Sequence, residues 1–335
     1  MEHDADPERL LELIGASWTT QVIRVAAELG VADALASGPR PVTDLAAEVG
    51  AHESSLRRLV RALVALDLCT DAAGDRVAMT PTGALLASGD GSLRSWARWW
   101  GGPSWVEWGD LLDAVRTGRP VRPGDGFADA GADPEGAAMF DDAMASLSAL
   151  EAPTVVAALQ LRGDELVVDL GGGSGMLVRA VVDRHPEARA MVVDLPGAVA
   201  SARARFAAWG VEDRCEAVVG DLFGELPPGG DAYVLKSVLH DWDDDDARRI
   251  LVRCVAAAGP DARIEVVERL VPERSERTAA ARSTARMDLH MLIAQGGRER
   301  TEAELRSLLA SAGLTVVEVR PAGSVAVIEA VQADR

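Results

Sequence analysis

The stretch Leu166-Val-Val-Asp-Leu-Gly-Gly-Gly-Ser-Gly175 decides the fold of this chain. Its first five residues form an apolar run broken by one aspartate, which is typical of a central parallel strand covered on both faces. Gly171, Gly173 and Gly175 then allow a tight turn and a close approach of the backbone to a ligand. A helix expected over 176–184 points its N-terminus at the same place. The stretch therefore predicts a ligand-binding strand, turn and helix.

The glycine spacing separates this loop from two phosphate-binding motifs. The pattern Asp-x-Gly-x-Gly-x-Gly is not the dinucleotide fingerprint, which would need glycine where Met176 stands, and it lacks the Gly-Lys-Ser/Thr of a P-loop. A loop without those devices better suits a ligand with a carboxylate and a ribose, and S-adenosylmethionine is the commonest such ligand. The alternative is a glycine turn of an unrelated α/β fold.

The composition indicates an acidic enzyme with room for two domains. The chain has 335 residues, of which 48% are hydrophobic, and 34 Lys plus Arg face 53 Asp plus Glu, a net charge of -19. This charge argues against nucleic acid or an anionic membrane surface as partner. Three dispersed cysteines without metal-ligand spacing indicate a reducing, cytoplasmic location. The sequence shows no signal peptide and no apolar run long enough to span a membrane.

Residues 1–95 are expected to form a separate, helical N-terminal domain. The expected elements are helices over 7–14, 19–29 and 53–68, a further helix capped by Thr43, and a two-stranded wing around Gly74. This is a winged-helix arrangement. It would bind DNA through Arg57, Arg58 and Arg61 in a transcription regulator, or it would serve as an oligomerisation scaffold. Three arginines are weak evidence in so acidic a chain, so the scaffold is preferred.

Residues 96–150 are expected to connect the two domains and to supply a lid. Five tryptophans fall within the thirteen residues 96–108, and they favour an interdomain core over the lining of an aromatic pocket. The stretch 118–134 is rich in Gly, Pro and Asp, as a linker would be. A helix over 137–150 carries Phe140 and Met144 on one face.

From residue 166 onward strands and helices alternate, which predicts an α/β fold with a doubly wound, mostly parallel sheet within a domain of residues 96–335. The expected strands are 166–170, 190–195, 216–221, 232–238, 263–270, 314–320 and 325–331. Only residues 321–324 separate the last two, enough for a tight hairpin, so the sheet should end with one antiparallel strand. Ligands of such sheets bind at the carboxyl ends of the strands.

Acidic residues stand at three successive strand ends. Asp194 ends the second expected strand, where a carboxylate can accept hydrogen bonds from both ribose hydroxyls of a nucleoside. Asp221 ends the third, placed for an adenine amino group, with Leu222 beside it as an apolar face. Any one of these acids could be a surface residue or a helix cap. With Asp169 they make a nucleoside site the preferred interpretation.

His240 follows the fourth expected strand and is the candidate general base. A histidine with a pKa near neutrality removes protons from hydroxyls at physiological pH. Glu268 ends the fifth strand and Glu299 lies in GGRERT, and carboxylates beside an imidazole fix its tautomer and stabilise the imidazolium. The alternatives are a histidine that only caps a turn, or a metal site of one histidine and two carboxylates. No metal is expected.

At these residues the chain resembles the S-adenosylmethionine-dependent O-methyltransferases of the plant caffeic acid and isoflavone type and their bacterial relatives that tailor polyketides and other aromatic natural products. The resemblance covers nearly the whole chain through the glycine loop and the motifs VVDLP, GDLF, LKSVLHDW, VVE and GGRERT, in that order. It implies a class I methyltransferase fold with an N-terminal winged-helix dimerisation domain, a homodimer, and methyl transfer to a hydroxyl that leaves S-adenosylhomocysteine.

The resemblance also implies roles for individual residues. The implied cofactor-binding residues are Asp169, Gly171, Gly173, Asp194, Asp221, Leu222 and Lys236, with Gly175 completing the loop. His240 would be the base with Glu268 and Glu299 beside it, and Phe140, Met144, Met291 and Asp241 would line the acceptor site. Some bacterial relatives keep the cofactor but perform hydroxylation or pericyclic chemistry, which is the alternative function. Glu265 departs from the family, which usually has an aliphatic residue there, and the segment before GGRERT is one residue shorter, which puts Met291 in doubt.

Overall fold

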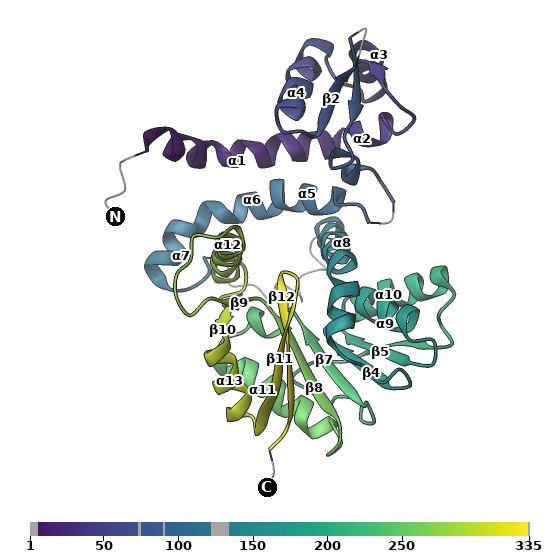
Figure 1. Ribbon diagram of the computed structural model, residues 1–335, viewed down its shortest axis with the longest axis vertical. Helices are drawn as coiled ribbons and strands as arrows, with labels where there is room; N and C mark the ends of the chain where they lie inside the picture. The colour runs from purple at the N-terminus through teal and green to yellow at the C-terminus, as the bar shows by residue number, and fades with distance from the viewer. Residues whose placement is uncertain (1–5, 73–74, 90, 122–133, 334–335) are drawn as a thin grey trace. The chain divides into compact units, whose positions relative to one another are not determined.

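The computed structural model describes residues 6–72, 75–89, 91–121 and 134–333, which fall into two compact units (Figure 1). The first unit comprises Met1–Val106 and Ala138–Leu147, and the second comprises Glu107–Ala137 and Ser148–Arg335. No helix among the described residues is long and apolar enough to cross a bilayer.

The first unit is built from helices and a small antiparallel sheet (Figure 1). Its elements are α1 (Pro7–Glu28), α2 (Val31–Ala34), β1 (Arg40–Pro41), α3 (Val42–Glu48), α4 (Glu53–Ala65), β2 (Cys69–Ala72), β3 (Arg76–Met79), η1 (Gly83–Leu86), α5 (Arg94–Gly101) and most of α6 (Pro103–Glu107). The strand order is β1-β3-β2. Leu45, Leu56 and Leu63 of α3 and α4 are buried in its core, so the expected winged-helix pattern is present. Gly74 of the wing lies outside the described residues.

One continuous helix, α1, replaces the two short helices expected over 7–14 and 19–29, and that prediction was wrong. The expected gap contains Gly15, and glycine in a helix interior costs about 1 kcal/mol relative to alanine. Tertiary packing outweighs this cost. The second half of α1 lies along α5, where Gln21 Nε2 donates to the carbonyl of Gly101 at 2.8 Å and Glu28 pairs with Arg98 at 2.8 Å.

Thr43 lies inside α3 and does not cap it, contrary to expectation. The helix begins after Pro41, whose φ of -59° already suits a helix entry, and no side chain caps the first turn. The Thr43 hydroxyl instead lies 3.3 Å from Glu53 Oε1.

The second unit contains the predicted seven-stranded sheet (Figure 1). The strands are β4 (Leu166–Leu170), β5 (Arg189–Asp194), β6 (Cys215–Val219), β7 (Ala232–Lys236), β8 (Arg263–Glu268), β11 (Leu314–Ala322) and β12 (Val325–Gln332). Their order is β11-β12-β8-β7-β4-β5-β6. The last strand, β12, is antiparallel to both of its neighbours, as expected, but it is inserted between β8 and β11 and is not the edge of the sheet.

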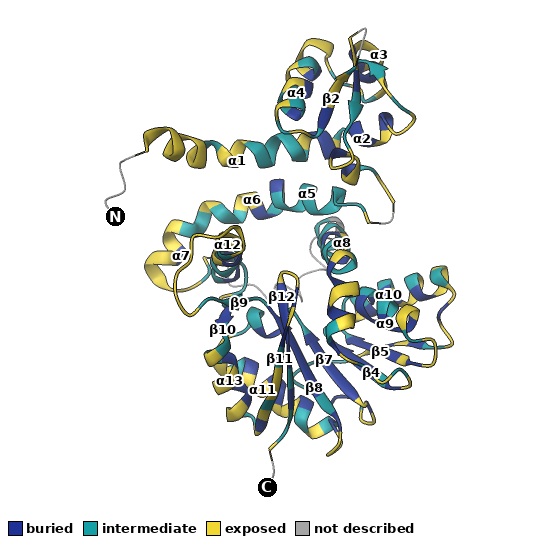
Figure 2. Cartoon of the chain, viewed as in Figure 1, coloured by how far each residue is buried: buried dark blue, intermediate teal, exposed yellow. Residues whose placement is uncertain are grey.

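Helices cover both faces of this sheet, whose strands are the most deeply buried part of the unit (Figure 2). One face packs against the second half of α8 (Pro134–Ala158), α9 (Met176–Arg184) and α10 (Pro196–Trp209). The other packs against α11 (Asp244–Ala257) and α13 (Glu302–Ser311). The remaining elements are η2 (Trp108–Asp110), α7 (Leu111–Thr117), η4 (Leu239–Asp241), α12 (Ala279–Ala294) and the short parallel pair β9 (Leu270–Val271) and β10 (Arg300–Thr301).

The tryptophan cluster is packed but not fully buried. Trp96 and Trp100 meet edge to face at 5.3 Å between ring centroids, and Trp99 meets Phe140 of α8 in the same way at 5.0 Å. The helix that carries Phe140 is longer than the expected 137–150. Most of the expected linker, 118–134, lies outside the described residues.

Buried Glu265 on β8 finds its partner in Arg320 of β11, whose Nη2 donates to Glu265 Oε2 at 3.1 Å. Arg320 also pairs with Glu318 at 2.7 Å and Glu329 at 2.5 Å. The register places Glu329 opposite Glu265 on one side and opposite Glu318 on the other, so three carboxylates cross three strands in a row around one guanidinium. Burial raises the pKa of Glu265 to about 7, although Arg320 opposes this shift.

Candidate active site

The glycine loop after β4 has the open geometry that a ligand needs. Gly173 has a φ of 56°, and a Cβ at this position would meet no atom within 4 Å, so the loop is free on that side. A Cβ on Gly172 would lie 2.5 Å from Asp169 Oδ2, because the Asp169 carboxylate lies directly against the loop.

Two predicted acids hold and face this loop. Asp194 Oδ2 accepts from the Gly173 amide and its Oδ1 from the Leu195 amide, both at 2.7 Å, and burial raises the pKa of Asp194. Each oxygen keeps a lone pair that can accept a ligand hydroxyl. Asp169 is 2% exposed, and its Oδ1 has no hydrogen-bond partner among the described residues. A buried oxygen without a partner fits a ligand that brings a donor to this place.

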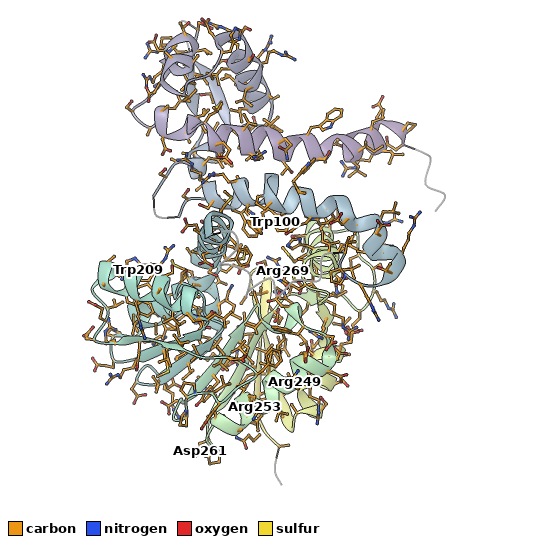
Figure 3. All side chains as sticks on the ribbon, turned by 180° about the vertical axis from the view of Figure 1, so that it is seen from behind. Trp100, Trp209, Arg249, Arg253, Asp261 and Arg269 are labelled. Atoms are coloured by element: carbon orange, nitrogen blue, oxygen red, sulfur yellow. The ribbon has the colours of Figure 1, made fainter. Side chains whose placement is uncertain are left out.

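Lys236, at the end of β7, is the only lysine of the chain, and its ammonium is already partnered. Its Nζ lies 2.9 Å from Glu151 Oε2 of α8 and 3.5 Å from the Ser148 hydroxyl. Arg269, labelled in Figure 3, reaches the other oxygen of Glu151 at 3.4 Å. Burial works to raise the pKa of Glu151, but Lys236 and Arg269 hold it below its usual value. The cluster thus contains two cations and one carboxylate, which suits a ligand carboxylate.

Asp221 lies in the turn after β6, two residues beyond the strand, which ends earlier than expected. Its Oδ1 accepts from the Phe223 amide at 2.9 Å, and Leu222 beside it is half-buried, as an apolar face should be. Phe223 packs edge to face on Trp242 at 4.8 Å and under the Arg249 guanidinium at 4.7 Å. Arg249 lies on α11 (Figure 3).

The three predicted catalytic side chains come together around His240 on η4. Its Nδ1 lies 3.2 Å from Glu299 Oε1 and 3.4 Å from Glu268 Oε2, and its Nε2 lies 3.6 Å from Asp241 Oδ1. The His240 side chain is 13% exposed, whereas the two glutamate side chains are buried. Two carboxylates facing Nδ1 favour a proton on that nitrogen, which leaves Nε2 as the acceptor of a further proton.

The charges around His240 shift several pKa values in a coupled way. Burial alone would lower the pKa of His240, but Glu268, Asp241 and Glu299 together raise it well above its usual value. Burial also raises the pKa of Glu268 and of Asp241, against the attraction of the His240 charge, and the crowding of carboxylates adds to both shifts. The cluster therefore binds protons more tightly than isolated side chains would.

Glu268 has a second role that the sequence did not reveal. Its Oε1 accepts from the backbone amides of Val238, Leu239 and His240 at 3.2, 2.8 and 3.3 Å. Glu268 therefore holds the turn itself as well as facing the imidazole. Because Oε1 is occupied by these amides, only Oε2 is left for His240.

The three side chains could also be considered as metal ligands, since one atom from each lies within 4.8 Å of the others. Nδ1 is hydrogen-bonded to Glu299 Oε1 at 3.2 Å, and a nitrogen that carries a proton toward a carboxylate does not ligate a metal at the same time. This geometry favours an oriented imidazole over a metal centre.

The residues expected to line the acceptor site fall in both units. Met291 is buried on α12, and Asp241 follows His240. Phe140 and Met144 are half-buried and belong to the first unit. Their roles toward an acceptor stay predictions.

His290 is a buried histidine close to His240 that the sequence analysis did not single out. It is 8% exposed on α12, its ring lies parallel to that of Trp108 at 6.4 Å, and its pKa is lowered to about 4, first by burial and then by the charge of His240. No sequence motif surrounds His290, so only its proximity to His240 in the folded chain draws attention to it.

The sequence matches two protein families. The O-methyltransferase domain covers residues 108–315, and the O-methyltransferase dimerisation domain covers residues 11–89.

Characterised proteins are similar to the chain over nearly its full length. The mitomycin biosynthesis 6-O-methyltransferase of Streptomyces lavendulae is 39% identical over 327 residues, 96% of this chain and 92% of the relative. The aclacinomycin 10-hydroxylase RdmB of Streptomyces purpurascens is 35% identical over 96% of this chain and 88% of the relative. A crystal structure of NcsB1, an O-methyltransferase from neocarzinostatin biosynthesis in complex with S-adenosylmethionine and 2-hydroxy-5-methyl naphthoic acid, has a TM-score of 0.76 and 36% identity over 94% of this chain and 96% of that chain.

The fold agrees with these matches. Strands β4 to β8 and the glycine loop with Asp194 lie within the range of the O-methyltransferase domain, and α2 to β3 of the helical N-terminal unit lie within the range of the dimerisation domain. The chain therefore belongs to the S-adenosylmethionine-dependent O-methyltransferases, and S-adenosylmethionine is its cofactor.

Proposed function

We propose that the protein methylates a phenolic hydroxyl of an aromatic or polyketide-type small molecule, with His240 as the general base. The observation that carries this proposal is the His240 imidazole, buried with Nδ1 against Glu299 and Glu268. A base held by two orienting carboxylates has an obvious use where a hydroxyl must lose its proton.

The residues around the glycine loop fit the cofactor. Asp194 would bind the ribose hydroxyls, the turn of Asp221 and Leu222 would hold the adenine, and the cations of Lys236 and Arg269 would face the carboxylate. Asp169 would receive a donor at its unpartnered oxygen. The bound cofactor supplies an electrophilic methyl group on a sulfonium.

The chain's own part in the reaction is to orient the acceptor and remove its proton. Holding a phenolic oxygen at near-attack distance accounts for most of the acceleration. His240 Nε2 would take the hydroxyl proton, while Nδ1 keeps its proton toward Glu299, so the imidazolium that forms is stabilised by carboxylates already in place. Phe140, Met144 and Met291 would pack on a flat ring, since methionine adapts to irregular apolar shapes and packs on aromatic faces.

The acceptor class is supported by the similar proteins. NcsB1 was solved with a hydroxylated naphthoic acid, and a mitomycin 6-O-methyltransferase is 39% identical. The test is incubation with methyl-labelled cofactor and a panel of phenols and hydroxynaphthoic acids. One equivalent of S-adenosylhomocysteine for each methyl ether is expected.

One specific observation keeps a second function open for testing. A hydroxylase, RdmB, is among the relatives at 35% identity, so family membership alone does not fix the reaction. A hydroxylated product without consumption of the methyl group in the same panel would replace methylation by this alternative.

We further propose that the N-terminal unit forms a homodimer. The match to a dimerisation domain supports this, and so does an apolar face at the start of α1, the end of the chain that Figure 2 shows exposed. The exposed residues of this face are Leu10, Leu11, Leu13, Ile14 and Trp18. Solvent exposure of so many large apolar side chains on one helix is unfavourable and favours burial against a second copy. DNA binding by this unit is the less supported alternative, because Arg57 is already paired with Glu53 and Asp75.

Light scattering tests the dimer directly. The wild type should have about twice the chain mass of 35.2 kDa, and Leu11→Asp should shift the protein toward the monomer, because a buried carboxylate at the interface is costly. Leu112→Asp, a residue that is 60% exposed on α7, is the matched control and should leave the mass unchanged. A wild-type monomer at micromolar concentration would contradict the proposal.

Activity is expected to be independent of divalent metal. The hydrogen bond between Nδ1 of His240 and Glu299 engages two of the three side chains that could hold a metal. Turnover should therefore survive dialysis against a chelator. Loss of activity that a divalent ion restores would overturn the assignment of His240 as base.

A further inference from the structure

A buried arginine, Arg300, donates hydrogen bonds to the turn that carries His240. Arg300 is 2% exposed and lies on the short strand β10. Its Nη1 donates to the carbonyl of Leu239 at 2.7 Å, and its Nη2 donates to the carbonyl of Trp242 at 2.8 Å. One carbonyl precedes His240 in the chain and the other follows it, so a single guanidinium spans the turn.

The amides of the same turn are held from the other side by Glu268, whose Oε1 accepts three of them. The turn follows Ser237, which has a φ of 53°. A left-handed conformation is strained for a residue other than glycine and persists only where surrounding contacts over-determine it. Here a carboxylate fixes the donors and a guanidinium fixes the acceptors.

We propose that Arg300 is a positioning residue that sets the His240 imidazole for proton removal by fixing the carbonyls of Leu239 and Trp242. The inference rests on the proposed role of His240 as base. The guanidinium is itself fixed, because its Nε donates to Asp244 Oδ1 at 2.9 Å at the start of α11. Serving two carbonyls and a carboxylate at once needs the planar fork of an arginine, and the ammonium of a lysine cannot replace it.

Arg300→Ala and Arg300→Lys should both lower kcat, by about 10- to 100-fold, because displacement of a catalytic group by about 1 Å costs up to about 10² in rate. Cofactor affinity, measured by titration calorimetry, should stay close to wild type, since Asp194 and the glycine loop are on other strands. Loss of cofactor binding together with kcat in both variants would instead assign Arg300 to the general fold and overturn the proposal.

Arg248→Ala is the matched control. Arg248 also donates to a backbone carbonyl, that of Ser311 at 3.0 Å, but it is exposed and its acceptor lies outside the turn that carries His240. This variant should keep the wild-type kcat. Millimolar methylguanidine should restore part of the activity of Arg300→Ala, because it can refill the vacated site, and it should have no effect on the control. If methylguanidine fails to restore activity although the variant still binds the cofactor fully, the proposed role of the hydrogen bonds to the two carbonyls is contradicted.

A double-mutant cycle separates this inference from the proposed function. If Arg300 acts through His240, adding Arg300→Ala to His240→Ala should cause little further loss, since the two changes remove one function. Equal losses in both backgrounds would overturn the positioning role while leaving His240 as base. Wild-type turnover by His240→Ala alone would instead overturn the proposed role of His240 as general base.

Discussion

Replacing His240 by alanine is expected to lower kcat by about 10²- to 10⁴-fold, the usual contribution of a general base. Cofactor affinity should be nearly unchanged, because the imidazole faces Glu268, Glu299 and Asp241 and none of the loop residues. Steady-state kinetics and titration calorimetry on the same preparation measure the two quantities. Glu299→Gln should cost less, since it removes only the charge of one partner of Nδ1 and keeps an oxygen that can accept its hydrogen bond.

The proposed role of His240 also predicts how kcat/KM changes with pH. A base works in its deprotonated form, so kcat/KM should rise with pH through the pKa of His240. The sequence suggested an ordinary histidine value, whereas the surrounding carboxylates of Glu268, Asp241 and Glu299 move the expected rise to higher pH. Glu299→Gln should shift the profile back toward lower pH, because one of the charges that raises this pKa is gone. Wild-type turnover by His240→Ala at neutral pH would mean that the acceptor arrives already ionised or that proximity suffices.

Replacing Asp194 by alanine should weaken cofactor binding by about 1.5–3 kcal/mol, the range for a hydrogen bond to a charged group whose partners are left unpaired. Asp194 also holds the Gly173 and Leu195 amides, so the loop loses a support together with the ribose contact.

Titration calorimetry with Asp183→Ala provides the control for this prediction. Asp183 is a half-exposed carboxylate on α9 that pairs with Arg179, and its loss should leave cofactor affinity unchanged. Unaltered binding by Asp194→Ala would remove Asp194 from the ribose site.

The sequence predicts well what depends on neighbours in the chain. The limits of β4 agree residue for residue with the apolar run 166–170, and the hairpin of β11 and β12 follows from four intervening residues. The carboxyl ends of the parallel strands β7 and β8 share one edge of the sheet, which brings His240 and Glu268 together, whereas Glu299 reaches them from the residue before β10.

The sequence did not predict contacts between segments that lie far apart in the chain. Glu151 is one polar residue in a long helix, and no residue near it in the sequence indicates an ion pair with Lys236, 85 residues away. The sequence did not predict a partner for Glu265, because that partner, Arg320, lies on another strand. The unfavourable helix propensity of Gly15 is a local property, whereas the packing that keeps α1 continuous comes from α5.

The lone lysine determines which reagents can report on this protein. Among 34 cationic residues only Lys236 is a lysine, and its side chain is 8% exposed and paired with Glu151. All three cysteines are buried, and burial raises the pKa of Cys69 and of Cys215 to about 11, so little thiolate forms at neutral pH. Amine- and thiol-directed cross-linkers will therefore find few attachment points on the folded chain, and covalent trapping of an oligomer will need carboxylate-directed coupling or an introduced cysteine.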